Sequence, residues 1–232
     1  GAASKINNES KSIALACGSH SGSKLHSREA FKILWEYDID INNLKCPKSK
    51  TSPLEHNCSG KHAAFLATCK KMNWPLDSYL KGDHPLQIEI FRIVSELLEI
   101  PSSEINAERD DCGAPTLYLK LLEMSRLYSL LSSSENAELE QISRAMAINP
   151  IMISDNNKFD TEIIKASHGN VIGKGGAEGI QCLCKVNEGI GLALKVEDGS
   201  KRAKHAVSLH LLKQLEWISD LRIQDIEEKV FN

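Results

Sequence analysis

The chain has 232 residues, 41% hydrophobic and 25% charged, a composition that supports a buried core and excludes disordered and collagen-like proteins. Its 28 basic and 31 acidic residues give a net charge of −3 without a basic run, which argues against a nucleic-acid partner. No apolar stretch approaches the roughly 20 residues that span a bilayer, and no signal segment opens the chain, so we expect a cytoplasmic protein without a membrane partner.

Helical periodicity dominates the first 150 residues. Apolar spacing predicts helices over residues 25–37, 62–72, 86–98, 117–131 and 137–147. Asp83 is the expected cap of the third of these helices, with Pro85 in its first turn. Asn149 and Pro150 are expected to end the last one.

The pattern changes to a period of two after residue 170. Residues 179–186 and 190–197 predict two strands, and Asn187-Glu188-Gly189 supplies the turn of a hairpin. Residues 202–217 return to helix spacing. Helices first, then an antiparallel sheet flanked by a C-terminal helix, predict an α+β fold in a single domain over residues 1–232, although the length is also compatible with two domains.

Seven cysteines form an odd set in a chain without a signal segment, which argues for reduced thiols and against a disulfide framework. Cys182 and Cys184 point to one face of a predicted strand. A buried row of thiols explains them at least as well as a redox pair does.

The segment Asn-Cys-Ser-Gly-Lys-His at residues 57–62 stands directly before a predicted helix. Ser59 is the expected N-cap, which places the Cys58 thiol at the positive end of the helix dipole, where a thiolate is favoured. The cation of Lys61 acts in the same direction. A well-made helix start without chemistry remains the alternative.

Two more segments combine nucleophiles with ionisable groups. Asp110 and Asp111 precede Cys112 in a turn, and adjacent acids of this kind are usually solvated charges at a helix start. Two thiols with a lysine or histidine can bind Zn²⁺, but the spacing alone is a weak signal. Ser19 lies beside His20 in a segment rich in small residues, and it needs a base to become a nucleophile.

A glycine-rich segment at residues 173–179 leads into the predicted hairpin. It lacks the spacing of a phosphate-binding loop, so nucleotide binding is disfavoured. Lys174 followed by glycines on an edge strand is similar to the Lys-Thr-Gly element of serine acyl-transfer enzymes. The alternative is a structural bulge formed by the glycines.

Five motifs in register resemble the asparaginase II family, the Rhizobium-type or class 3 L-asparaginases. They are Ser-His-Ser-Gly at 19–22, Asn-Cys-Ser-Gly-Lys-His at 57–62, Asp-x-Cys-Gly-x-Pro at 110–115, Lys-x-Gly-Ala-Glu-Gly at 174–179 and Asp-Gly-x-x-Arg-Ala at 198–203. The resemblance covers nearly the whole chain. It implies a serine β-lactamase and glutaminase-like fold and hydrolysis of L-asparagine to L-aspartate and ammonia, and it is compatible with a homodimer.

The resemblance also implies roles for individual residues. Ser19 matches a catalytic serine, Lys174 the lysine that works with it, and Asp110 an active-site carboxylate. The family's Zn²⁺ ligands match Cys58, Lys61 and Cys112. A lysine ligand must be neutral, so the metal and its pocket would have to lower the pKa of that amine strongly.

One departure from the family weakens the expectation of activity. The family carries a Ser-x-x-Lys pair upstream of the segment that matches Gly1-Ala2-Ala3, and we expect this pair and the first strands of the sheet to be missing. A fragment of an asparaginase, a shortened homologue and a protein whose zinc site serves only binding or structure all remain open. A small zinc-binding or redox protein is the non-enzymatic alternative. We expect these 232 residues alone to hydrolyse asparagine feebly or not at all.

Overall fold

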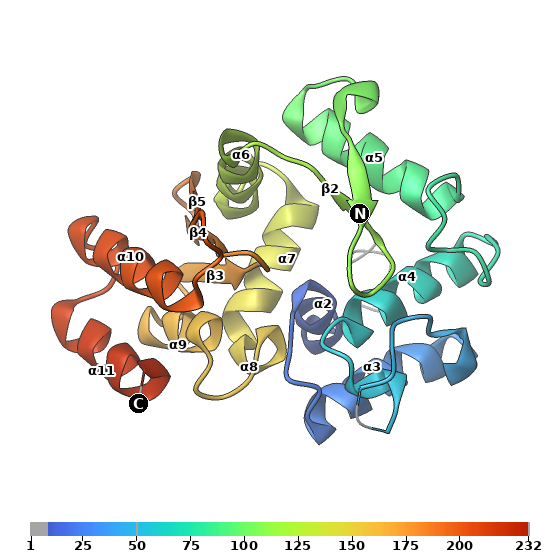
Figure 1. Ribbon diagram of the computed structural model, residues 1–232, viewed down its shortest axis with the longest axis horizontal. Coiled ribbons are helices and arrows are strands. Elements are labelled where there is room, and N and C mark those ends of the chain that lie inside the picture. Colours follow the sequence, from blue (N-terminus) through green and yellow to red (C-terminus); the bar gives the residue numbers. More distant parts are fainter. Residues whose placement is uncertain (1–8, 50, 232) are drawn as a thin grey trace. The chain divides into compact units, whose positions relative to one another are not determined.

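The computed structural model describes residues 9–49 and 51–231, and the chain divides into two units, residues 1–119 and 120–232 (Figure 1). Each unit has its own helices and its own antiparallel sheet. The expectations about the chain around Gly1 lie outside the described residues. Within the described residues, no helix has the length and apolar character needed to cross a membrane.

The first unit is mainly helical. Its elements are α2 (Ser10–Cys17), α3 (Lys24–Glu36), α4 (Ser59–Lys71), α5 (Pro85–Leu98), the 3-10 turns η1 (Ile41–Asn43), η2 (Pro53–Glu55) and η3 (Ser102–Glu104), and the strands β1 (Ala107–Arg109) and β2 (Pro115–Leu117). Helix α4 packs against both α2 and α3. Fully buried leucines such as Leu15, Leu34 and Leu66 form the core between these three helices.

The three predicted helices of this unit are confirmed, but two predicted caps are wrong. His84 caps α5 in place of Asp83, because its imidazole Nδ1 accepts a hydrogen bond from the backbone of Leu86 at 3.1 Å. Cys58 occupies the N-cap position of α4, and Ser59 is the first helical residue. The Ser59 hydroxyl instead donates to the carbonyl of Leu54 at 2.8 Å.

The second unit builds a three-stranded sheet among six helices. Its elements are α6 (Leu121–Ser132), α7 (Ala137–Ile148), α8 (Pro150–Ile153), α9 (Phe159–Ala166), β3 (Val171–Gly175), β4 (Ile180–Lys185), β5 (Ile190–Lys195), α10 (Lys201–Gln214) and α11 (Asp220–Phe231). The strands lie antiparallel in the order β3-β4-β5. The predicted hairpin is confirmed as β4 and β5, and Asn187 and Gly189 in its turn both have a φ of 64°.

Two sequence expectations need correction in this unit. Pro150 follows the end of α7, as predicted, but it also begins the short helix α8. The helix predicted over residues 117–131 begins later than expected, because Leu117 belongs to β2 of the first unit and α6 begins at Leu121. Proline fits the first turn of a helix, where its missing N–H has no intrahelical partner.

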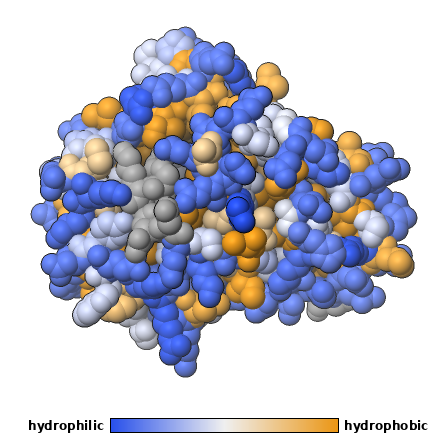
Figure 2. Space-filling view, turned by 180° about the vertical axis from the view of Figure 1, so that it is seen from behind, coloured by the Kyte–Doolittle hydropathy of each residue, from blue (hydrophilic) through white to orange (hydrophobic). Residues whose placement is uncertain are grey.

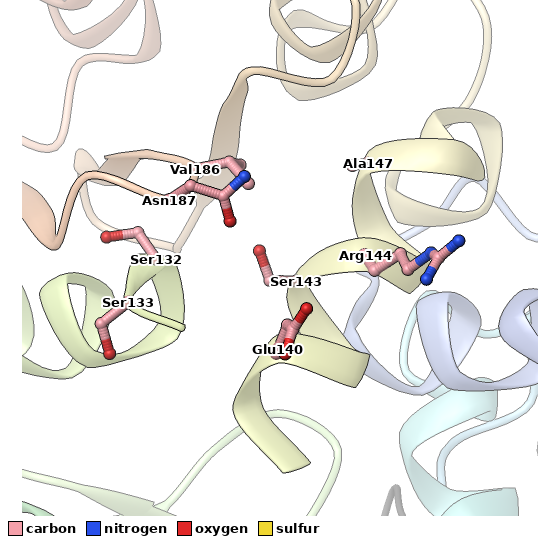
Figure 3. Close-up of a pocket in the computed structure, with 8 residues that line it drawn as sticks. All are labelled: Ser132, Ser133, Glu140, Ser143, Arg144, Ala147, Val186 and Asn187. Atoms are coloured by element: carbon pink, nitrogen blue, oxygen red, sulfur yellow. The ribbon is translucent and has the colours of Figure 1, made fainter. Parts of the chain in front are cut away.

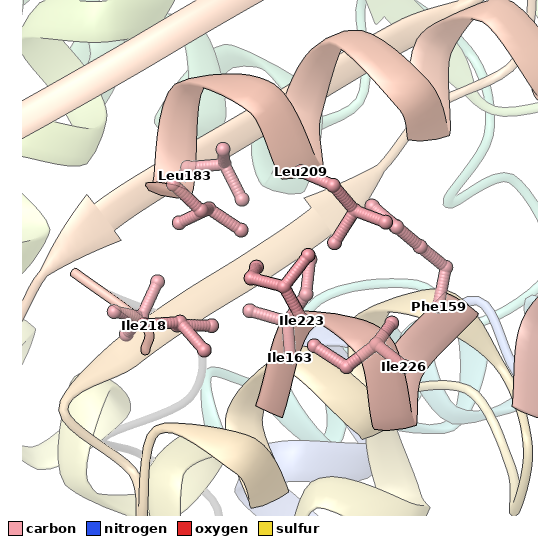
Figure 4. Close-up of a cluster of buried hydrophobic side chains, with 9 residues drawn as sticks. Phe159, Ile163, Leu183, Leu209, Ile218, Ile223 and Ile226 are labelled. Carbon is pink, nitrogen blue, oxygen red and sulfur yellow. The ribbon is translucent and has the colours of Figure 1, made fainter. Parts of the chain in front are cut away.

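A hydrophobic cluster fills the space between the sheet and helices α9, α10 and α11 (Figure 4). Leu183 of β4 packs there with Ile163 of α9 and Leu209 of α10, each at most 2% exposed. Helix α6 packs against β5 and β4. Gly191 permits this contact, since a Cβ there would lie 2.1 Å from the backbone oxygen of Ser125.

The mixture of helices and small antiparallel sheets confirms the predicted α+β class. The face of the molecule drawn in Figure 2 carries mainly hydrophilic residues, with hydrophobic ones scattered among them. All seven cysteines are free, as the sequence predicted.

Candidate functional site

Two close backbone approaches assemble the site of the first unit. A Cβ on Gly60 would lie 2.5 Å from the backbone oxygen of Leu15, so glycine lets the start of α4 contact the last turns of α2. Gly22 has a φ of +67°, and a Cβ there would lie 1.8 Å from the oxygen of Glu55. The loop between α2 and α3 therefore lies against the segment that leads into α4.

This packing brings Ser19 to Asn57, which directly precedes Cys58. The Asn57 side-chain amide donates to the Ser19 hydroxyl oxygen at 3.0 Å, and the Asn57 carbonyl accepts from the backbone of His20 at 3.2 Å. His20 is buried at 2% exposure and stacks on His26 with ring centroids 4.6 Å apart. Ser19 itself is exposed, on a loop anchored by buried groups.

The thiols of Cys58 and Cys112 interact directly, although 54 positions separate them in the sequence. A hydrogen bond from Cys112 lowers the pKa of the Cys58 thiol to about 7, against the effect of burial and with help from the charge of Lys61. The same hydrogen bond, together with burial, raises the pKa of Cys112 to about 12. This hydrogen bond therefore favours the thiolate form at Cys58 and the protonated thiol at Cys112.

Lys61 and Asp110 complete the charged part of the cluster. The Lys61 amine lies 3.2 Å from Asp110 Oδ2, and both side chains are about 30% exposed. Burial alone would lower the pKa of Lys61, but the charges of Cys58, Cys112 and Asp110 raise it. Burial would raise the pKa of Asp110, but hydrogen bonds from Cys112 and Lys61 and the lysine charge lower it.

The β1–β2 turn fixes Asp110. Its Oδ1 accepts from the backbone of Cys112 at 2.9 Å and from that of Ala114 at 3.2 Å, while Gly113 turns the chain with a φ of 82°. Asp110 is therefore more than a solvated charge, because one of its carboxylate oxygens accepts the backbone hydrogen bonds that stabilise the turn. The other oxygen receives Lys61, so the turn places Cys112 and Asp110 beside α4.

His62 and Tyr79 are buried near Cys112, and neither was predicted as a site residue. The Tyr79 hydroxyl accepts from the backbone of Lys45 at 2.9 Å and lies 2.6 Å from His62 Nδ1. Both side chains are fully buried, and His62 Nε2 has no hydrogen-bond partner. The imidazole acts on Cys112 by lowering its pKa against the larger opposing effects. His62 belongs to the predicted 57–62 segment, whereas no local pattern marks Tyr79.

Whether the predicted ligands suit zinc depends on their donor atoms. Among residues 9–49 and 51–231, no group of three or more His, Cys, Asp or Glu side chains is arranged to hold a metal ion. The predicted ligands contain only two residues of those types, Cys58 and Cys112, with the amine of Lys61 as the third donor. Two thiols and an amine are donors of the kind that zinc takes, so the chemistry of Cys58, Cys112 and Lys61 fits the ion, and zinc binding stays a prediction.

Lys174 lies on β3 of the second unit, at the edge of the sheet as the sequence predicted. Its cross-strand neighbour is Cys182. The prediction that Lys174 shares a cavity with Ser19 and Asp110 stays a prediction, because those two residues belong to the first unit.

Cys182 and Cys184 are packed in the sheet. They are 5% and 0% exposed, and burial raises the pKa values of their thiols to about 11 and about 12. Thiols in this state are poor nucleophiles at neutral pH. The buried row is favoured over the redox pair.

A pocket of about 280 Å³ opens between α6, α7 and the β4–β5 turn of the second unit (Figure 3). It is lined by Ser132, Ser133, Glu140, Ser143, Arg144, Ala147, Val186 and Asn187. The hydroxyl of Ser143 is buried without a hydrogen-bond partner. None of the predicted site residues lines this pocket.

The comparisons with known proteins agree with the motifs. The family model of L-asparaginase II matches residues 1–231. A search of curated proteins found no match. Because the family match spans nearly the whole chain that carries the Ser19, Cys58 and Cys112 motifs, the chain belongs to the L-asparaginase II family.

Proposed function

We propose that this protein is an amidohydrolase that converts L-asparagine to L-aspartate and ammonia, with Ser19 as nucleophile. The observation that carries the proposal is the cluster in the first unit. There an exposed serine hydroxyl accepts a hydrogen bond from Asn57, next to a residue pair in which Cys58 is poised as a thiolate. Family membership supports the reaction class.

In the proposed reaction, the Ser19 oxygen attacks the side-chain carboxamide carbon of asparagine. A neutral amine on Lys174 takes the hydroxyl proton and returns it to the nitrogen that leaves as ammonia. The resulting aspartyl ester on Ser19 is then hydrolysed by water, which releases aspartate and restores the hydroxyl. The pairing of Ser19 with Lys174 is the one that the family resemblance implies.

Asn57 and Asp110 assist without exchanging protons with the substrate. The Asn57 amide orients the Ser19 oxygen and stabilises negative charge that develops on it. Asp110 holds the amine of Lys61 and the backbone of Cys112 at the edge of the site. These contacts fix the positions of the groups before the substrate binds.

Cys58, Lys61 and Cys112 would hold the zinc ion. Bound there, zinc would supply positive charge that orients the substrate rather than activating water. The acidic surroundings of Lys61 favour its ammonium form when zinc is absent, so zinc binding must release protons from this cluster. Zinc affinity should accordingly rise with pH until these ligands are deprotonated.

The test is ammonia release from L-asparagine by the purified chain, beside Ser19→Ala. We expect slow turnover in the parent and at least a 10²-fold lower rate in Ser19→Ala, because an acyl-transfer unit loses most of its effect when its nucleophile is removed. Ser21→Ala is the matched control, and it should keep the parental rate. A parental rate of ammonia release in Ser19→Ala would contradict the proposal.

A further inference from the structure

A buried charged cluster lies under the glycine that follows Lys174. Asp160 of α9, Gln181 of β4 and Lys204 of α10 are 8%, 0% and 5% exposed. All three surround Gly175, where a Cβ would lie 2.8 Å from the Lys204 amine, 3.2 Å from Gln181 Oε1 and 3.4 Å from Asp160 Oδ2. Charged side chains are rarely this buried unless their surroundings compensate them.

The hydrogen bonds of this cluster lead to Lys174. Asp160 Oδ2 accepts from the backbone N–H of Gly175 at 2.8 Å, and the carbonyl of Gly175 accepts from the Lys174 amine. Lys174 and Cys182 are cross-strand neighbours, as are Gly175 and Gln181. Since side chains alternate between the faces of a strand, the cluster lies on the opposite face from Lys174. It is linked to the Lys174 amine by the backbone of Gly175, whose N–H and C=O belong to two successive peptide groups.

We propose that Asp160 is the positioning residue of Lys174, acting through the backbone of Gly175, with Gln181 and Lys204 holding Asp160 in place. The significance for catalysis rests on the proposed function, but the positioning itself does not. Nothing in the sequence motifs assigns a role to these three residues.

The amide nitrogen of Gln181 has two acceptors, Asp160 and the carbonyl of Cys182, whereas its oxygen has no donor. Its Nε2 donates to Asp160 Oδ1 at 2.8 Å, and its Oε1 is buried without a hydrogen-bond partner. A flipped amide would point Nε2 away from the carboxylate. The observed orientation therefore gives both carboxylate oxygens a donor and leaves the amide oxygen unpaired.

Lys204 supplies the compensating charge. Burial lowers the pKa of its amine, and the negative charge of Asp160 opposes that effect. The amine of Lys204 and the carboxylate of Asp160 therefore lie in one buried cluster with charges of opposite sign. Gly175 has no side chain, which leaves the space that the Lys204 amine needs.

The test measures how fast Lys174 is acetylated by an amine reagent, relative to the exposed Lys11, with peptide mass spectrometry of the intact chain. In Asp160→Ala the Gly175 peptide loses its anchor. We expect the Lys174 rate to rise about fivefold, the factor that corresponds to one hydrogen bond of about 1 kcal/mol. In Asp160→Asn, the amide oxygen can take the place of Oδ2 as the acceptor for Gly175, and the amide nitrogen can donate to a rotated Gln181, so the rate should stay within about twofold of the parent.

Glu162→Ala is the matched control. It removes a buried carboxylate from the same helix, one that pairs with Lys165 and Lys229 and not with Gly175, and it should leave the Lys174 rate unchanged. If Asp160→Ala does not fold, Gln181→Met tests the same point, because it keeps the volume, removes the donor to Asp160 and should raise the rate two- to fivefold.

The inference fails if the variant that folds leaves the Lys174 rate unchanged, or if Asp160→Asn or Glu162→Ala raises it as much. Turnover gives a separate readout. Asp160→Ala should lower kcat for asparagine with KM nearly unchanged, whereas Glu162→Ala should leave both unchanged. A general loss of folded protein would lower kcat in both variants. Ammonia release that survives Lys174→Ala would overturn the proposed function and leave the acetylation result intact.

Discussion

The thiols of the two units differ in what surrounds them. In the first unit, Cys58 stands at the start of α4 with a thiol donor and a lysine beside it, and its pKa falls to about 7. In the second unit, Cys182 and Cys184 stand in a packed sheet, and burial raises their pKa values to about 11 and about 12. Hydrogen-bond donors and nearby charge outweigh burial at Cys58, whereas burial dominates at Cys182 and Cys184, as it also does at Cys46 and Cys69 of the first unit.

Zinc affinity should show the largest difference between cysteine variants of the two units. Cys58→Ser and Cys112→Ser should each lower zinc affinity roughly 10²–10³-fold, about one ligand's share of the 10–16 kcal/mol that structural zinc sites supply. Cys182→Ser should leave the affinity unchanged. Competition with a chromophoric chelator measures all three, and equal losses in Cys58→Ser and Cys182→Ser would break the comparison.

Alkylation rates should show the same contrast without metal. At pH 7 about half of Cys58 is thiolate, against roughly 10⁻⁴ of Cys182, and the higher intrinsic nucleophilicity of a more basic thiolate recovers about 10²-fold of that difference. Iodoacetamide should therefore modify Cys58 about 10²-fold faster, as read by peptide mapping of the zinc-free protein. Zinc should protect Cys58, and a Cys182 rate that matches it would disprove the assignment.

Packing in the second unit should respond to Gly191. In Gly191→Ala the added methyl would lie 2.1 Å from the oxygen of Ser125 and 2.3 Å from the nitrogen of Ser129, so α6 must move. We expect a loss of about 3 kcal/mol in the free energy of unfolding, typical of overpacking.

Denaturant titration measures that loss, and Gly82→Ala is its control, because a Cβ at Gly82 meets no atom within 4 Å. Zinc affinity of folded Gly191→Ala should equal that of the parent. A loss of zinc affinity in Gly191→Ala would mean that packing at Gly191 and zinc binding in the first unit are coupled.

The smallest expected effect is a pH dependence from His205, which stacks on Phe159 with ring centroids 4.0 Å apart. Burial, with nearby Lys204, lowers the pKa of His205 from 6.5 to about 4. Between these values the unfolded chain binds the proton and the folded chain does not, so stability is present above pH 6.5 and falls as pH decreases toward 4. Partial exposure reduces the contribution to about 1–2 kcal/mol.

His205→Phe should keep the stack and remove this part of the pH dependence, as measured by thermal unfolding between pH 7 and pH 4. His168→Gln changes an exposed histidine and should keep the parental slope. A parental slope in His205→Phe would assign the titration to another group.

The sequence allowed α3 to α7, α10 and the β4–β5 hairpin to be predicted, because apolar periodicity and turn residues are local signals, whereas α2, α9 and α11 were not predicted. Strand β3 was expected only around Lys174, since its glycines obscure the period of two. The cap at His84 was missed because an imidazole competes there with the more usual Asp83.

The site was predictable to the extent that the family motifs cover it. Ser19, Cys58 and Cys112 stand in such motifs, and the structure brings the two thiols together. Tyr79 reaches His62 across 17 positions, and Asp160 reaches Gly175 across 15, so only tertiary packing reveals them. Their polarity alone does not distinguish them from surface residues.

The most direct measurement of the central claim is the covalent state of Ser19 during turnover. The chain is incubated with L-asparagine, quenched in acid and digested, and the peptide masses are measured by mass spectrometry. We expect an aspartyl ester on the peptide that carries Ser19, absent from Ser19→Ala and lost on treatment with hydroxylamine. An acyl group on another residue, or ammonia release with no acylated peptide at any quench time, would contradict it.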